Sequence, residues 1–189
     1  MIRKIVFTTL FFSGLLGSLE AYADAPELIR ALLSGEHIAL MRHSIAPGSG
    51  DPANFRIGDC STQRNLSDGG RLQAGEIGLM LRESGLREAR LVSSQWCRCI
   101  ETAELMSVGE VEELELLNSL IAYRGQSEVI TSRLSDWISE QDLNTPIILV
   151  THSVNIGALI GRYPQEGEIV FARLTEAGDL VLVGSIQPN

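Results

Sequence analysis

The sequence predicts an α/β protein, a three-layer α/β/α sandwich with a mostly parallel central sheet. Short apolar runs typical of buried strands alternate along most of the chain with stretches whose apolar residues recur at helical spacing. This alternation is typical of a parallel sheet with helices on both faces. In addition, charged and polar residues directly follow several of the strands. That placement points to a ligand site, because such folds bind ligands at the carboxyl ends of their strands.

The first part of the chain contains a helix, a strand, a long loop and a second helix. Residues 27–33 are predicted to form a short helix, and residues 36–42 a buried strand. Proline and glycine interrupt any periodicity over 44–65, and a loop of this length in a compact domain is usually functional or disordered. Ser67 is a typical N-cap for the next helix, which ends at Gly85.

The rest of the chain continues the alternation and then closes with two strands joined by a tight turn. The most strand-like stretch of the whole sequence is residues 145–151. In chain order the predicted elements are a short strand (89–94), a helix (97–106), a strand (111–117), a long helix with the apolar face Ile130, Leu134, Trp137 and Ile138, a strand (145–151), a helix (153–161) and a hairpin (167–174 and 179–186).

Residues 1–23 are predicted to be a secretory signal peptide. Two basic residues precede an uncharged apolar run over 5–19, and the segment ends in the small-x-small pattern Ala-Tyr-Ala. The run is shorter than the roughly 20 apolar residues that a membrane span needs, and no later stretch reaches that length. An N-terminal anchor helix is the alternative. Residues 24–189 are predicted to form a single domain, located in the periplasm or outside the cell.

Charge and cysteine content exclude several classes of function. The formal net charge is −9 at pH 7, and an acidic protein is a poor general binder of nucleic acid or anionic membranes. The three cysteines Cys60, Cys97 and Cys99 are too few for a structural zinc site, and no metal or nucleotide motif is present. In an exported chain they predict one disulfide and one remaining thiol.

Two arginines and two histidines follow predicted strands. Arg42 and His43 end the first strand, Arg98 lies just after the second, and His152 follows the strand over 145–151. We expect all four at one rim of the sheet. Arginine forks match phosphate oxygens, and a histidine among them can act as nucleophile, general acid or hydrogen-bond donor. The pattern therefore predicts a pocket for a phosphate group.

Four stretches carry a resemblance to a known family. They are LMRHS (40–44), NLSDGGRLQA (65–74), LVSSQWCRCIETA (91–103) and LVTHSVN (149–155). Together they resemble, in order, the motifs of the histidine phosphatase superfamily, also called the phosphoglycerate mutase-like superfamily. More loosely, the chain is similar to the exported lipopolysaccharide core heptose phosphatases of that superfamily, because it is short and carries an export signal.

The resemblance implies a role for each residue of the rim. His43 would be the nucleophile that becomes phosphohistidine, and Arg42 and Arg98 would bind the phosphate oxygens. His152 would be the second histidine, charged or donating, that stabilises the transferring group. No metal or organic cofactor is implied, since phosphoryl transfer depends mainly on positioning and charge stabilisation. His43 must be neutral to attack.

The general acid that protonates the leaving oxygen is not identified by the sequence. Many members of the superfamily place it in a Glu-Gly motif, which is absent, and others place an Asp after the late histidine, where this chain has Ser153. The candidates that remain are chosen by proximity alone. They are Glu113, Glu115, Asp59 and Asp51.

Other residues are assigned smaller roles. Arg64 is predicted to contact the substrate or to form a salt bridge at the helix entry, and Ser153 to cap the next helix with its N–H facing phosphate. Trp96 is expected to form a pocket wall, and His37 to be structural. A Cys60–Cys97 disulfide would hold the loop over the pocket, with Cys99 packed inside; a Cys60–Cys99 pair is the alternative.

These observations predict an exported phosphatase that hydrolyses phosphomonoesters, such as a small phosphate ester or a phosphorylated glycan of the cell envelope. A mutase is disfavoured because the chain is short. The alternatives are a phosphatase of phosphohistidine proteins and a non-catalytic module that binds phosphoanions or glycans. The sequence does not indicate an oligomeric state.

Overall fold

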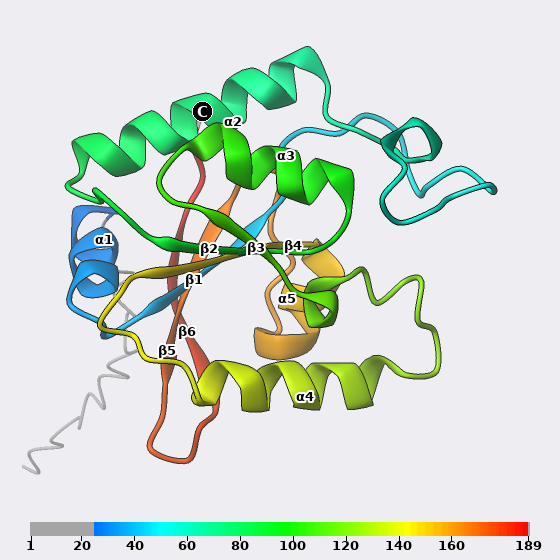
Figure 1. Cartoon of the computed structure of the whole chain (residues 1–189). Helices are drawn as coiled ribbons and strands as arrows, with labels where there is room; N and C mark the ends of the chain where they lie inside the picture. The colour runs from blue at the N-terminus through cyan, green and yellow to red at the C-terminus, as the bar shows by residue number, and fades with distance from the viewer. Residues whose placement is uncertain (1–24, 189) are drawn as a thin grey trace, which may run out of the picture.

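A single six-stranded sheet connects the parts of the chain that the structure, a computed structural model, describes: residues 25–188 (Figure 1). The predicted signal peptide, residues 1–23, lies outside the described residues. The strands are β1 (Ile38–Arg42), β2 (Arg90–Ser93), β3 (Val111–Glu113), β4 (Ile147–Thr151), β5 (Ile169–Leu174) and β6 (Leu180–Ile186). The helices are α1 (Ala25–Leu33), α2 (Asp68–Glu83), α3 (Cys97–Met106), α4 (Ser127–Ser139) and α5 (Ser153–Ile160), with 3₁₀ turns at Cys60–Thr62 and Glu115–Leu117.

The strand order is β3-β2-β4-β1-β5-β6, and the sheet is mostly parallel as predicted. Strands β3, β2, β4 and β1 pair in parallel, whereas β5 is antiparallel to β1 and β6 is antiparallel to β5. The closing hairpin is thus added to the β1 edge of a parallel sheet.

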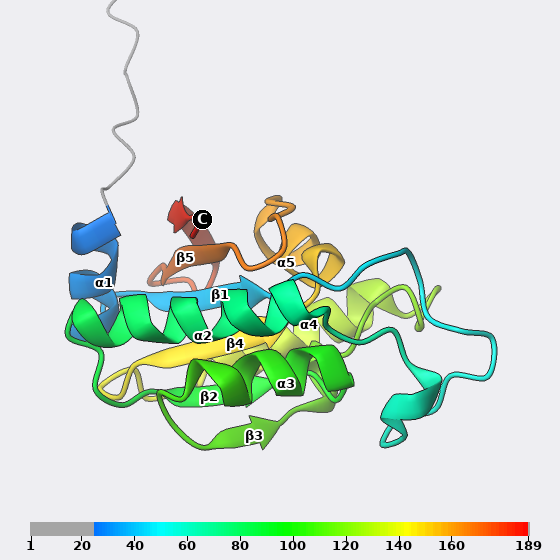
Figure 2. The ribbon, with the colours of Figure 1, turned by 90° about the horizontal axis from the view of Figure 1, so that it is seen from above.

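Helices cover both faces, which confirms the predicted three layers. Helices α2 and α3 lie on one face, and α4 and α5 lie on the other (Figures 1 and 2). The alternating side chains of β1 explain this arrangement, because successive residues point to opposite faces. Ala39 and Met41 belong to the core beneath α2, whereas Ile38 and Leu40 belong to the core against α4.

All six predicted strands are shorter in the structure, and contacts explain the difference for two of them. Strand β1 begins at Ile38 rather than at residue 36, because the N–H groups of Glu36 and His37 both donate to Ala31 O and close the preceding helix. The segment 111–117 forms only the short strand β3 before a 3₁₀ turn. There Leu117 is buried, and its carbonyl accepts a hydrogen bond from Thr151 Oγ1.

Candidate active site

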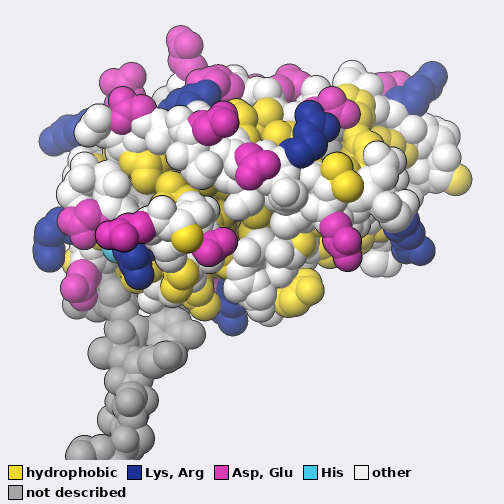
Figure 3. Space-filling model, turned by 90° about the horizontal axis from the view of Figure 1, so that it is seen from below, with side chains coloured by type: hydrophobic (Ala, Val, Ile, Leu, Met, Phe, Trp, Pro, Cys, Tyr) yellow, Lys and Arg dark blue, Asp and Glu magenta, His cyan; other side chains and the backbone are white. Residues whose placement is uncertain are grey.

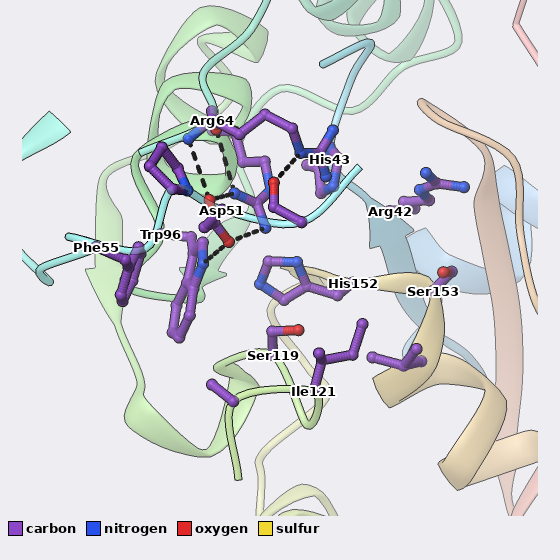
Figure 4. A pocket seen from close by; sticks show the side chains of 15 residues that line it. Arg42, His43, Asp51, Phe55, Arg64, Trp96, Ser119, Ile121, His152 and Ser153 are labelled. Atoms are coloured by element: carbon purple, nitrogen blue, oxygen red, sulfur yellow. Dashed lines mark hydrogen bonds and ion pairs between the residues drawn. The ribbon is translucent and has the colours of Figure 1, made fainter. Parts of the chain in front are cut away.

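The order and register of the strands bring the predicted rim together. Strand β4 lies between β1 and β2, and Arg42 pairs with Thr151 while Ser93 pairs with Val150. The three strands therefore end at the same level. His43 and His152 follow their strands directly, with ring centroids 5.5 Å apart in an edge-to-face arrangement (Figure 4).

His43 is held in the tautomer that a nucleophile needs. Its Nδ1 lies 2.8 Å from Ser44 O, and a carbonyl oxygen can only accept, so Nδ1 carries the proton and Nε2 keeps a free lone pair. The side chain is 2% exposed. Burial lowers the pKa of His43 to about 3, with help from the charges of Arg98 and Arg42 and against the hydrogen bond to Ser44. The imidazole is therefore neutral at any physiological pH.

His152 is also buried, and Ser94 and Cys99 contact one ring nitrogen. Its Nε2 lies 3.1 Å from Ser94 Oγ and 3.6 Å from Cys99 Sγ. Burial lowers the pKa of His152 well below its usual value, and the neighbouring His43 lowers it further. Of the two predicted states, the lowered pKa favours the neutral ring over the charged one. Ser94 Oγ donates to Asn118 Oδ1 at 3.2 Å and can therefore accept from His152 Nε2.

Arg98 lies in the first turn of α3 and is 3% exposed. Its Nη1 donates to Asp51 Oδ1 at 2.8 Å and to Arg64 O at 3.1 Å, and its Nη2 donates to Asp51 Oδ2 at 3.2 Å. The structure pairs Cys60 with Cys97, the residue before Arg98. The disulfide thus ties the long loop to the helix that carries this arginine.

Arg42 is held from another part of the chain. Its Nη2 lies 3.2 Å from Glu166 Oε1, and its Nη1 donates to Pro164 O at 3.2 Å. Both side chains of the ion pair are 24% exposed. The sequence did not identify Glu166 as a site residue. Its acidic side chain in the turn before the closing hairpin was the only indication.

Arg64 and Ser153 both line the pocket. The Arg64 guanidinium donates to the loop carbonyls of Ala46 and, at 3.1 Å, of Gly50, so its position is set by the loop itself. It also lies 3.8 Å from Glu166. The prediction that Ser153 caps α5 is wrong. The helix begins at Ser153 itself, and His152, whose backbone is still extended, is the N-cap.

The segment NLSDGGRLQA, which resembles a family motif, orients the loop that follows His43. Ser67 caps α2, since its Oγ accepts from Gly70 N at 3.0 Å. A Cβ at Gly70 would come within 2.1 Å of Ile45 O, so only glycine permits this close approach. Gln73 Oε1 accepts from Ile45 N at 3.2 Å, and its Nε2 donates to Glu166 O at 3.3 Å.

The pocket between these residues has a volume of about 340 Å³ and two chemically different sides. The histidines and arginines form one side, and aromatic and aliphatic side chains form the other (Figure 4). Trp96, expected to be a pocket wall, lines this second side and stacks on Phe55 with ring centroids 4.8 Å apart. Ile121 extends this apolar side and is largely exposed.

Only one of the four candidate general acids lines the pocket: Asp51. Burial raises its pKa, but hydrogen bonds from Arg98, Trp96 and the backbone of Arg64 outweigh burial and leave the pKa below its usual value. Asp59 is partly exposed and caps a 3₁₀ turn, and Glu113 and Glu115 are exposed; none of these three residues lines the pocket. None of the four is therefore placed as a proton donor.

The remaining predictions concern structural residues and metals. Cys99 is a free, buried thiol, as expected, and burial raises its pKa to about 12. His37 is buried at the start of the sheet, away from the pocket. Within residues 25–188 no three metal-ligating side chains cluster, and no helix of that part is long and apolar enough to cross a membrane.

Comparison with curated proteins finds one short similarity. No protein-family model matches the chain. The chain is 34% identical over 73 residues to the mitochondrial serine/threonine-protein phosphatase Pgam5 of Drosophila virilis. The match covers 39% of this chain and only 22% of the relative.

Comparison with solved structures covers most of the chain. The protein histidine phosphatase SixA in complex with tungstate is 17% identical, with a TM-score of 0.54 over 80% of this chain and 97% of that one. The phosphoserine phosphatase of Entamoeba histolytica in complex with 3-phosphoglyceric acid is 16% identical, with a TM-score of 0.58 over 81% and 98% of the two chains. These neighbours are members of the histidine phosphatase superfamily, so the chain has the phosphoglycerate mutase-like fold that its motifs predict.

Proposed function

We propose that the protein is a phosphatase that hydrolyses phosphomonoesters through a phosphohistidine at His43. The observation that carries the proposal is the state of His43: neutral, with its proton held on Nδ1 by Ser44 O and with Nε2 unprotonated. Arg42, Arg64 and Arg98 line the same pocket. The proteins with this fold include a protein histidine phosphatase and a phosphoserine phosphatase by name.

The reaction follows from these positions in two steps. His43 Nε2 forms a bond to phosphorus while the bond from phosphorus to the ester oxygen breaks. Water then attacks phosphorus, the N–P bond breaks, and inorganic phosphate leaves. Arg42 and Arg98 stabilise the charge on the phosphoryl oxygens in both steps, and preorganised charge of this kind is usually the largest contribution to catalysis.

No carboxyl group in the pocket is placed to protonate the leaving oxygen, because Asp51 is bound as a carboxylate. The leaving group must therefore depart as an anion or take its proton from solvent. This favours substrates with a good leaving group, such as aryl phosphates, over simple alkyl phosphates.

The direct test is hydrolysis of p-nitrophenyl phosphate by the wild type and by His43→Ala. We expect the variant to lose at least about 10³-fold in kcat, as when a covalent nucleophile is removed. Rapid acid-free quench with ³²P-labelled substrate should trap labelled protein in the wild type only. His37→Asn is a matched control, since His37 is buried outside the pocket. Equal rates for the wild type and His43→Ala would refute the assignment.

We further propose that the protein is exported and acts on phosphorylated sugars or glycans of the cell envelope. The composition of residues 1–23 supports export, and so does the Cys60–Cys97 disulfide, since disulfides persist in oxidising compartments. Fractionation of cells that express the tagged full chain tests this. Recovery of the protein with its N-terminus at Met1 in the cytosol would contradict it.

Acidic side chains outnumber basic ones, 24 to 15, which argues against nucleic-acid partners. Figure 3 shows one face of the molecule, on which acidic and basic side chains are interspersed among apolar ones. Such a face lacks the continuous basic stripe that a phosphate backbone requires. The proposed partner is therefore a small phosphate ester or a phosphorylated glycan.

A non-catalytic module that binds phosphoanions is the second candidate. The specific observation in its favour is that Asp51, the one carboxyl group among the described residues that line the pocket, is held as a carboxylate. The quench experiment separates the two: micromolar binding of inorganic phosphate without a labelled adduct or turnover would favour the binding module. A phosphohistidine peptide tested beside p-nitrophenyl phosphate addresses the related possibility that the substrate is a phosphorylated protein.

A further inference from the structure

The carboxylate of Asp51 lies inside the proposed active site, and protein groups occupy all of its hydrogen-bond acceptor sites. It accepts hydrogen bonds from Arg98 Nη1 at 2.8 Å, Arg98 Nη2 at 3.2 Å, Trp96 Nε1 at 2.9 Å and Arg64 N at 3.1 Å (Figure 4). A carboxylate offers about four lone-pair sites, so none is left for a substrate. Asp51 therefore acts on its protein neighbours rather than on the ester.

The four donors come from two separate segments of the chain. Arg98 and Trp96 begin helix α3, while Arg64 ends the long loop in which Asp51 itself lies. The same two segments are joined again by the Cys60–Cys97 disulfide and by Cys97 N, which donates to Gln63 Oε1 at 3.0 Å. The loop is thus fastened to the start of helix α3 at Trp96, Cys97 and Arg98.

The way Asp51 binds Arg98 determines which edge of the guanidinium remains free. Both terminal nitrogens are engaged, so the planar group cannot rotate without breaking two charge-assisted hydrogen bonds. The Nε–H is buried and has no partner among the side chains and backbone. A buried arginine N–H without a partner is costly, which makes it a natural donor for an anion.

We propose that Asp51 is a positioning residue for phosphoryl transfer: it holds Arg98 so that the free donors of the guanidinium face the phosphate beside His43. This inference rests on the proposed phosphatase function, and it assigns the long loop a part in building the anion site. A loop held in this way supplies an oriented charge without reorganisation when the substrate arrives, as electrostatic preorganisation requires.

Two other roles are open to a carboxylate at this position, and they predict different results. If Asp51 occupied the phosphate position, its removal would improve phosphate binding. If Asp51 were the general acid, its removal would affect poor leaving groups far more than good ones. A positioning residue that acts through Arg98 should weaken both binding and turnover, equally for all leaving groups.

The experiment compares the wild type, Asp51→Asn, Arg98→Lys and the double variant on p-nitrophenyl phosphate and an alkyl phosphate. We expect Asp51→Asn to lower kcat/KM by about 10- to 100-fold on both substrates, the range for a misplaced electrostatic group. When Arg98 is already replaced by lysine, Asp51→Asn should lower kcat/KM by less than about threefold, because the two residues act as a unit. Asp59→Asn is the control: this aspartate of the same loop is partly exposed and does not line the pocket, so kcat/KM should change little.

Binding of inorganic phosphate by calorimetry separates failure of this proposal from failure of the proposed function. A wild type that binds phosphate but turns over neither substrate would refute the phosphatase, while weaker binding by Asp51→Asn would still support the positioning role. Four results for Asp51→Asn would each overturn the positioning role. They are tighter phosphate binding, a loss of kcat/KM confined to the alkyl phosphate, a loss that adds fully to that of Arg98→Lys, and no loss of kcat/KM. If Asp51→Asn does not fold, Trp96→Phe removes one donor to Asp51, and we expect a loss of about threefold from it with the same non-additivity.

Discussion

Arg98 and Arg42 both line the pocket, and the protein holds them in different ways. Arg98 is buried in α3 and bonded to Asp51 through both terminal nitrogens, beside the disulfide that ties the long loop to this helix. Arg42 is partly exposed and meets Glu166 through one nitrogen, at 3.2 Å, in an ion pair that solvent reaches. A buried pair is costly to break, whereas an exposed pair contributes little to stability.

This difference suggests that Arg98 and Arg42 have different roles in the pocket. Arg98 is held in one orientation, and in the proposed phosphatase it would determine where the phosphate group binds. Arg42, with a solvated partner, can adjust to the substrate at low cost. We therefore expect changes on the Arg98 side to affect both stability and activity, and changes on the Arg42 side to affect activity alone.

The largest effect is expected from Arg98→Ala. Its removal leaves the Asp51 carboxylate without its counter-charge, which should lower the free energy of unfolding by about 3–5 kcal/mol. It should also lower kcat/KM by about 10³-fold, because a preorganised charge is lost. Urea denaturation and p-nitrophenyl phosphate kinetics measure the two losses. A variant as stable as the wild type would contradict the proposed contrast.

Arg42→Ala should separate activity from stability. We expect kcat/KM to fall by about 10²-fold, while the free energy of unfolding changes by less than about 1 kcal/mol, since Glu166 is solvated. The same two assays apply. A stability loss equal to that of Arg98→Ala would show that the two arginines are held alike.

Replacing both disulfide cysteines by serine tests whether the loop holds Arg98. The bridge spans 37 residues, and its loss should lower the free energy of unfolding by about 2–4 kcal/mol. We expect kcat/KM to fall by about tenfold as well, because Asp51 is less firmly placed. An unchanged kcat/KM in the double serine variant would contradict the proposal that the loop positions Arg98.

His43 reports on both arginines through its pKa. Burial dominates the lowering to about 3, and Arg98 contributes more than Arg42. Removing Arg98 should therefore raise the pKa of His43 by a fraction of a pH unit, and removing Arg42 by less. Because the folded pKa lies below the unfolded value, protonation costs stability as pH falls from about 6.5 towards 3. NMR titration of the imidazole measures the shift, and a lower pKa in the Arg98 variant would contradict this sign.

The smallest effect is expected from Glu166→Gln. The amide keeps the shape and can still accept from Arg42, so kcat/KM should fall only about threefold and stability should barely change. Steady-state kinetics at low and high salt measure this, since the wild-type pair should weaken with salt and the variant should not respond. A loss as large as that from Asp51→Asn would mean that both arginines depend equally on their carboxylates.

Much of the site was predictable because it is built at strand ends. Arg42, His43 and His152 follow apolar strands directly, and parallel strands bring their carboxyl ends to one edge. Arg98 follows the same rule through the first turn of α3. The fold class was predictable for a related reason, since alternation of apolar runs and helical periodicity is local in the sequence.

The partners of the arginines were not predictable from local pattern. Glu166 lies 124 positions beyond Arg42, in a turn with no periodicity, and Asp51 lies in a loop whose path depends on a disulfide. The sequence weighed Asp51 only as a general acid, whereas the structure shows it bound as a carboxylate to Arg98. The split of residues 111–117 into a strand and a 3₁₀ turn likewise depends on a distant hydrogen bond from Thr151.

The sequence by itself determined the alternation of strands and helices, the acidic charge, and the four residues at the rim, because these follow from short-range pattern and from the direction of parallel strands. Only the tertiary structure decided the protonation state of His43, the pairing of Cys60 with Cys97, and which carboxylate holds which arginine. Those properties depend on burial and on contacts between segments far apart in the chain, and the local sequence determines neither of them.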